Sequence, residues 1–225
     1  MMRAGTGIFF IRRQRLPYDA EVEYLQSDGA TFVQLPFRPT NNIAFALTVY
    51  RGANSQRWDC GAQTGWSSNA ARFIIQENQY CYWQYGATAT QTSITPSHNL
   101  VGTLVCTVSG RSCTVRKIGG NTYSKTYNAS TFTAPANFAL FAVGTSPTTS
   151  AVAASSGSRL FSAVVSDTGV SFDLIPVRFK NSQGVSEGAL YDRENPSGGP
   201  LGNGLYPATS TAKFTGSLIG PDKTT

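Results

Sequence analysis

Charge is scarce in this 225-residue chain, because only 13% of its residues are Asp, Glu, Lys or Arg, about half the usual share. It also has a single histidine, His98, which lies beside Pro96 and Asn99 in a turn-like stretch. No spacing around His98 supports a Ser–His–Asp triad. No glycine-rich phosphate loop follows a strand and opens a helix, so nucleotide chemistry is not expected either.

Long apolar runs and helical periodicity are also scarce. The N-terminal region has only the run at residues 8–11, which is too short for the core of a signal peptide or for a membrane span. We therefore expect no ordinary export signal and no membrane insertion. Elsewhere apolar residues alternate with polar ones between Gly, Asn, Ser and Pro, which is typical of short strands. The chain is long enough to form one all-β domain with a substantial core.

Basic residues concentrate near the N-terminus. Four arginines face one acid in the first twenty residues, which gives this segment a charge of +3 out of a total of +6. We predict that residues 1–17 form an extended, basic assembly arm and that residues 18–225 form one domain. A solvated tail is the alternative, and the remainder has no basic stripe typical of nucleic-acid binding. The candidate docking residues of the arm are Ile8, Phe9, Phe10, Arg12, Arg13 and Arg15.

Several strands can be placed from alternation and turn residues. Residues 31–35 and 43–50 are expected to be strands, and a hairpin is expected to turn at residues 168–169 with Val165 opposite Phe172.

Other segments extend this pattern. Phe161 is expected on the buried side of the same hairpin. The Ser/Thr/Ala-rich residues 144–158 are predicted to form a long surface loop. The Gly/Pro-rich tail after Asn195 contains Tyr206 and Phe214, which we expect to pack against the domain.

The four cysteines lack the close Cys/His pairs of a zinc site. A hairpin turning at residues 109–110 would place Cys106 directly opposite Cys113, about 5.5 Å apart at Cα, a separation compatible with a disulfide. The alternative is four free thiols acting as small buried hydrophobes. A chain that folds in a cytoplasm favours the free thiols.

Aromatic residues crowd residues 80–85. A two-residue turn before this strand would pair Ile74 with Cys81, so the Cys81 side is expected to be buried. Tyr80 and Tyr82 then point outward, where exposed aromatics suit sugar stacking or a protein interface. Core packing with ordinary surface tyrosines is the alternative. The candidate carbohydrate-binding residues are Tyr80, Tyr82, Trp66 and Trp58.

Paired carboxylates would indicate a glycoside hydrolase, which needs two such groups about 5–10 Å apart. The nearest approximations among the twelve acids are Glu21 with Glu23 and Asp192 with Glu194. Neither pair lies in a run of alternating apolar residues across a groove. We therefore expect a protein that is not an enzyme, and a glycoside hydrolase is the weakest alternative.

Segments near both ends of the domain resemble one family. Val22-Glu-Tyr-Leu-Gln-Ser-Asp-Gly-Ala and then Leu35-Pro-Phe-Arg-Pro are similar to the opening of concanavalin A-like domains of the laminin-G-like type. Phe172-Asp-Leu-Ile-Pro-Val-Arg, Gly188-Ala-Leu-Tyr-Asp and Phe214-Thr-Gly-Ser-Leu-Ile-Gly-Pro are similar to the closing part. Such domains recur in phage virion proteins and in surface proteins of gut bacteria.

The resemblance implies an all-β, two-sheet antiparallel jelly-roll sandwich whose concave sheet and loops offer a ligand surface. It implies no cofactor, although a calcium ion bound by the loops is left open. Fold alone does not define function in such a group.

The function that we expect is that of a non-enzymatic phage virion structural protein, associated with capsid or tail. Its N-terminal arm would bind other virion proteins, and its surface would contact host glycans. Such a protein assembles in the host cytoplasm, and the symmetry of particle appendages predicts a homo-oligomer such as a trimer. The alternative is a carbohydrate-binding adhesin on a bacterial surface, which needs an export route.

Overall fold

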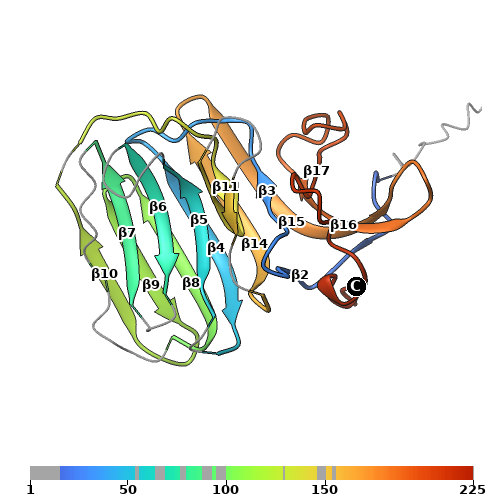
Figure 1. The fold of residues 1–225 in the computed structure, drawn as a ribbon, viewed down its shortest axis with the longest axis horizontal. Coiled ribbons are helices and arrows are strands. Elements are labelled where there is room, and N and C mark those ends of the chain that lie inside the picture. The colour runs from blue at the N-terminus through green and yellow to red at the C-terminus, as the bar shows by residue number, and fades with distance from the viewer. Residues whose placement is uncertain are drawn as a thin grey trace, which may run out of the picture.

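Two β-sheets packed face to face form a sandwich, and strands of the larger sheet continue beyond it toward the C-terminal end (Figure 1). The computed structural model describes residues 16–53, 56–63, 69–76, 80–87, 93–94, 100–128, 130–145, 151–153 and 156–224. Pairing within the sheets is antiparallel except for one parallel contact, between Gly144 and Ala62. The expected all-β class is therefore confirmed.

The larger sheet has the strand order β10-β9-β8-β4-β14-β15-β16-β17, with β1 added to β15 and β2 added to β14. Its strands are β1 (Ala20–Glu21), β2 (Leu25–Gln26), β4 (Ala44–Arg51), β8 (Gly102–Ser109), β9 (Ser112–Lys117), β10 (Thr122–Thr126), β14 (Arg159–Asp167), β15 (Val170–Lys180), β16 (Ser186–Asp192) and β17 (Leu205–Pro207).

The smaller sheet has β5 at its centre, paired with β6, β11 and β12. Its strands are β3 (Val33–Gln34), β5 (Trp58–Ala62), β6 (Ala70–Ile75), β7 (Cys81–Gly86), β11 (Ala139–Leu140), β12 (Ala142–Gly144) and β13 (Ala151–Ala153). The helix described is one 3-10 turn, η1 (Gly216–Leu218). In the described part of the chain no helix has the length and apolar character needed to cross a membrane.

The core fills the space between the sheets. Alternation along β4 turns Phe45, Leu47 and Val49 inward, and all three are buried. The ring of Phe45 lies 5.6 Å from that of Trp83 and 6.0 Å from that of Phe73, in edge-to-face contacts across the two sheets. Such aromatic pairs add a preferred geometry to the burial of apolar area.

The hairpin of β14 and β15 has the predicted register, with Val165 opposite Phe172 and a turn at residues 168–169. The expectation for Phe161 is wrong, because a β-bulge lies between Leu160 and Ser162. The bulge makes Phe161 the extra residue of β14. Its ring lies edge-to-face against Tyr24, partly exposed.

Two other hairpins differ from the predicted register. In the first, Cys81 lies opposite Ile75, and Ile74 lies opposite Tyr82. Gln76 N donates to Tyr80 O, so three residues separate these two positions rather than the two that were predicted. The pairing of the two strands is therefore shifted by one residue, and each residue of β7 lies opposite a different residue of β6 from the one predicted.

In the second, Cys106 lies opposite Val115 and Cys113 lies opposite Val108. The turn is one residue later than predicted and has Gly110 at a φ of 51°, which suits glycine. The partner of each cysteine shifts by two residues, so both thiols remain on the inner face.

The C-terminal tail packs against the sandwich as expected. Tyr206 and Phe214 are buried. A second, smaller core joins Ile175, Val177 and Phe179 of β15 with residues of β16 and β17. The prediction of a loop through residues 144–158 is wrong in part, because β13 within it pairs with β12.

Candidate functional site

The outer face of the smaller sheet, the side away from the main core, carries polar side chains together with Ile74 and Tyr82, and most of these side chains are buried. Asp59 of β5 lies opposite Ile74 of β6, which lies opposite Tyr82 of β7. The next row joins Arg72 of β6 with Gln84 of β7. Opposed residues in antiparallel strands share a face, so these side chains lie on the side away from the main core.

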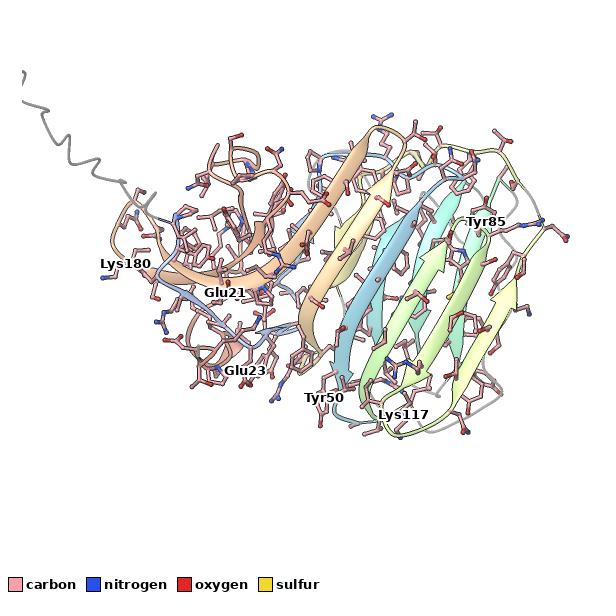
Figure 2. The ribbon with its side chains drawn as sticks, turned by 180° about the vertical axis from the view of Figure 1, so that it is seen from behind. Glu21, Glu23, Tyr50, Tyr85, Lys117 and Lys180 are labelled. Atoms are coloured by element: carbon pink, nitrogen blue, oxygen red, sulfur yellow. The ribbon has the colours of Figure 1, made fainter. Side chains whose placement is uncertain are left out.

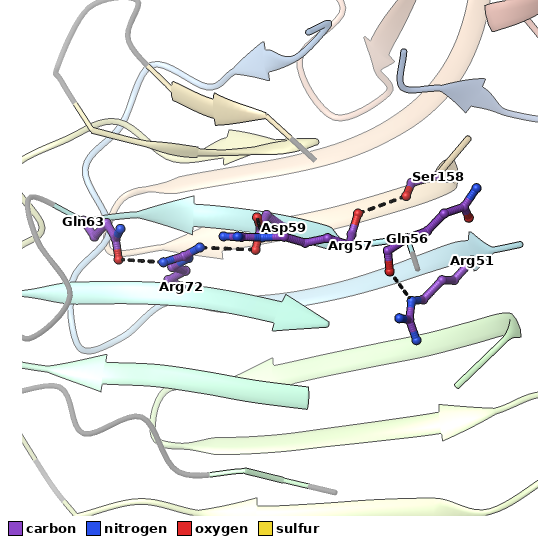
Figure 3. Close-up of polar contacts among 7 residues, drawn as sticks. All are labelled: Arg51, Gln56, Arg57, Asp59, Gln63, Arg72 and Ser158. Carbon is purple, nitrogen blue, oxygen red and sulfur yellow. Dashed lines mark hydrogen bonds and ion pairs between the residues drawn. The ribbon is translucent and has the colours of Figure 1, made fainter. Parts of the chain in front are cut away.

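Asp59 is the centre of an ion-pair network (Figure 3). Its carboxylate lies 2.5 Å from Arg57 Nε and 3.5 Å from Arg72 Nη2. Arg72 Nη1 also donates to Gln63 Oε1 at 3.2 Å. The side chain of Asp59 has no exposed surface and that of Arg72 has 1%, so this pair is buried.

Burial raises the pKa of Asp59 above its ordinary value, and the two guanidinium groups oppose that shift. A buried charge is tolerated only when it is paired and hydrogen-bonded. The Asp59 network therefore ties β5 to β6. A close approach of these strands accompanies it, because a Cβ on Gly61, whose φ is 121°, would lie 2.1 Å from Ala71 O.

A third arginine, Arg51, joins the two sheets at one end. Arg51, at the end of β4, is buried; its Nη2 donates to Gln76 O at 2.7 Å and its Nε donates to Gln56 O. Ser158 Oγ donates to Arg57 O at 3.1 Å. Figure 3 shows the Arg51–Gln56 and Ser158–Arg57 contacts beside the Asp59 network, and these two contacts fix the start of β5 against the larger sheet. Sequence reasoning missed the network, whose one local signal is the Arg57-x-Asp59 spacing.

Tyr82 lies on β7, Tyr80 immediately precedes this strand, and both remain partly exposed. Their ring centroids are 6.0 Å apart, with the rings tilted by 39°. Among the described residues, the next segment beside β7 is residues 93–94: Tyr82 forms an isolated bridge with Ser93, and Ile94 N donates to Cys81 O at 2.6 Å. Residues Cys81, Trp83 and Tyr85 point into the core, as predicted. The two tyrosines therefore form an aromatic pair at the edge of the outer face.

Trp58 is removed from the candidate set. It is fully buried, with its ring 6.4 Å from that of Phe73 and 6.4 Å from that of Phe141. Its position on β5 has the parity of Cys60, which also faces the core. Trp66 and His98 lie outside the described residues. So do the six candidate residues of the arm, Ile8, Phe9, Phe10, Arg12, Arg13 and Arg15.

In each of the two carboxylate pairs considered for hydrolysis, one acid has structural partners. Glu21 Oε1 accepts from Tyr18 Oη at 3.4 Å, and Glu21 Oε2 lies 3.7 Å from Lys223 Nζ. Figure 2 shows Glu21 and Glu23 at the opposite end of the molecule from Tyr85 of the smaller sheet. Asp192 is buried and accepts the backbone N–H groups of Asp173 and Glu194. Such bonds account for Glu21 and Asp192 without a substrate.

The four cysteines are free and buried. Burial raises the pKa of Cys60, Cys81, Cys106 and Cys113 above the ordinary thiol value. Cys106 and Cys113 are not directly opposed, so the geometry that would favour a disulfide is not formed. Among the described residues, no group of three His, Cys, Asp or Glu side chains is arranged to hold a metal ion.

No family model matches the chain, and no curated protein is found to be similar to it. The function must therefore be argued from the surfaces of the sandwich themselves.

Proposed function

We propose that this chain is a non-enzymatic binding and assembly protein of a virion, built as a concanavalin A-like jelly roll. In this proposal residues 1–17 attach the domain to other virion proteins, and the domain contacts glycans of the host surface. The observation that carries the binding role is the outward pair of Tyr80 and Tyr82 at the edge of the smaller sheet.

The Tyr80–Tyr82 pair has the properties of a stacking platform. Sugar rings present C–H groups that pack on aromatic faces, and the phenol adds a hydrogen-bonding tip. Burial is the largest cause that raises the pKa of Tyr82, and the neighbouring Tyr80 adds to it, so the phenol stays neutral at physiological pH. Tyr82 lies on β7 and Tyr80 immediately precedes it, and β7 is fixed by the core residues Trp83 and Tyr85 on its other face. A site on a packed strand is held more precisely than one on a loop.

The experiment is direct binding of the full chain to a broad glycan panel and to intact host-type cells, followed by variants of the platform. Tyr82→Ala should weaken binding to its best glycan by about tenfold, since stacking of this kind is worth roughly 1–3 kcal/mol. Tyr82→Phe keeps the ring and should retain most of the affinity. Thermal unfolding of both variants verifies that the domain is intact.

Two outcomes reject the Tyr80–Tyr82 assignment. One is unchanged glycan affinity in a folded Tyr82→Ala protein. The other is the absence of binding to every glycan and cell type, which would reduce the proposal to a structural role with residues 1–17 as the functional element.

A further inference from the structure

A row of side chains crosses the outer face of the larger sheet, on the opposite side of the sandwich from Tyr80 and Tyr82. Arg159 of β14 is paired with Gln26 of β2 on one side and with Tyr50 of β4 on the other. Directly opposed residues share a face. Tyr24, two residues before Gln26, lies on this face as well, and all four are partly exposed. We call these four residues the arginine clamp.

The guanidinium group of the clamp is held on three sides. Arg159 Cζ lies 4.2 Å from the ring centroid of Tyr24 and 5.3 Å from that of Tyr50. Arg159 Nε donates to Gln26 Oε1 at 2.8 Å. The Tyr24 ring is itself supported by Phe161 of the β-bulge, 5.8 Å away. An arginine side chain on a surface normally keeps much rotamer freedom. The contacts with the two rings and with Gln26 restrict that freedom, so the guanidinium group of Arg159 is pre-organised.

Most hydrogen-bonding groups of the arginine clamp that lack a partner among the described residues are donors. Within the described residues, no carboxylate lies within 4.0 Å of Arg159, and its two Nη groups make no hydrogen bond. The amide nitrogen of Gln26 and the hydroxyl groups of Tyr24 and Tyr50 likewise have no hydrogen-bond partner in that part of the chain. The nearest position across the sheet, opposite Tyr50, adds the hydroxyl group of Thr103.

These donors indicate which kind of ligand the arginine clamp can bind. A planar guanidinium fork matches a carboxylate in a bidentate geometry, and a fork already fixed in place loses little entropy on binding. Amide and hydroxyl groups around it suit a ligand that also carries hydroxyl groups. We propose that the arginine clamp binds a sugar that carries a carboxylate, such as a sialic or uronic acid residue of a glycan. This site is separate from the Tyr80–Tyr82 platform and does not rest on it.

The test is calorimetric titration of the full chain with 3′-sialyllactose and with a glucuronic acid disaccharide, using lactose as the neutral probe. Wild type should bind an acidic sugar at least about tenfold more tightly than lactose, and the affinity should fall as NaCl is raised. Arg159→Gln should lose about tenfold in affinity, and Arg159→Lys should lose part of it because the ammonium lacks the fork. Arg116→Gln is the matched control, since Arg116 is an exposed arginine on the outer face of the same sheet.

Several results would overturn the proposal. They are equal binding of lactose and sialyllactose, undiminished binding by Arg159→Gln, and no binding of either acidic sugar at millimolar concentration. Equal affinity for a glutamate-rich peptide would show that the clamp takes any carboxylate and would reject the sugar. Binding that is lost in Tyr82→Ala but kept in Arg159→Gln would leave the proposed function standing and remove the clamp.

Discussion

The two outer faces of the sandwich hold their arginines in opposite ways. On the smaller sheet, Arg72 is buried against Asp59 and its charge is neutralised inside the protein. On the larger sheet, Arg159 is partly exposed, stacked between two tyrosine rings and bonded to an amide. Acids fix a guanidinium by cancelling its charge, whereas aromatic rings fix it and leave the charge available. The same residue type is therefore part of the framework on one face and a candidate ligand group on the other.

The strongest test of this difference between the two faces is to remove the acid from the buried network. Asp59→Asn should lower the free energy of unfolding by about 3–5 kcal/mol, because Arg72 stays protonated and becomes a buried charge without its counter-ion. Urea denaturation at neutral pH measures the loss.

The control for Asp59 is Asp173→Asn, which removes a pair with the exposed Arg193. Exposed ion pairs contribute about 1 kcal/mol or less, so this variant should stay close to wild type. Equal losses of unfolding free energy in the two variants would show that the Asp59 network contributes no more to stability than the Asp173–Arg193 pair.

The second prediction concerns the reactivity of the four cysteines buried between the two sheets. In the native protein at pH 8 none of the four cysteines should react with a disulfide reagent, because they are buried and their pKa values are raised by burial. In guanidinium chloride all four should react. A count below four in the unfolded chain would reveal a disulfide.

The raised pKa values of the four thiols also determine how the stability of the folded chain changes with pH. A raised pKa means that the folded chain keeps thiol protons that the unfolded chain releases above the ordinary thiol pKa of about 8.5. The thiols therefore favour the folded state fully below that value, and this contribution is lost as pH rises toward the folded pKa. Native reactivity should consequently follow unfolding as pH rises, whereas an exposed thiol would follow its own ionisation.

The two outer faces differ in how much of their structure could be predicted from the sequence. Alternation along residues 80–85 correctly separated Tyr80 and Tyr82 from the core residues Cys81 and Trp83. The predicted pairing of Ile74 with Cys81, which was used to choose the buried side, was wrong, because Ile74 lies opposite Tyr82. The Asp59–Arg72 contact depends on the register of β5 with β6, and short-range patterns do not fix that register. The arginine clamp was missed for a related reason, since β2 and β4 reach β14 from distant parts of the chain.

The smallest expected effect is on stability at the clamp. Arg159→Gln should lower the free energy of unfolding by about 1 kcal/mol, because partly exposed cation–π contacts are worth roughly 0.5–1 kcal/mol each and the glutamine recovers part of the packing. The measurement is the same urea denaturation as for Asp59→Asn, and the two values are compared directly. A loss as large as that of Asp59→Asn would mean that Arg159 is a framework residue, and the contrast between the two faces would disappear. A small loss joined to a large fall in affinity for an acidic sugar would separate binding from folding at this position.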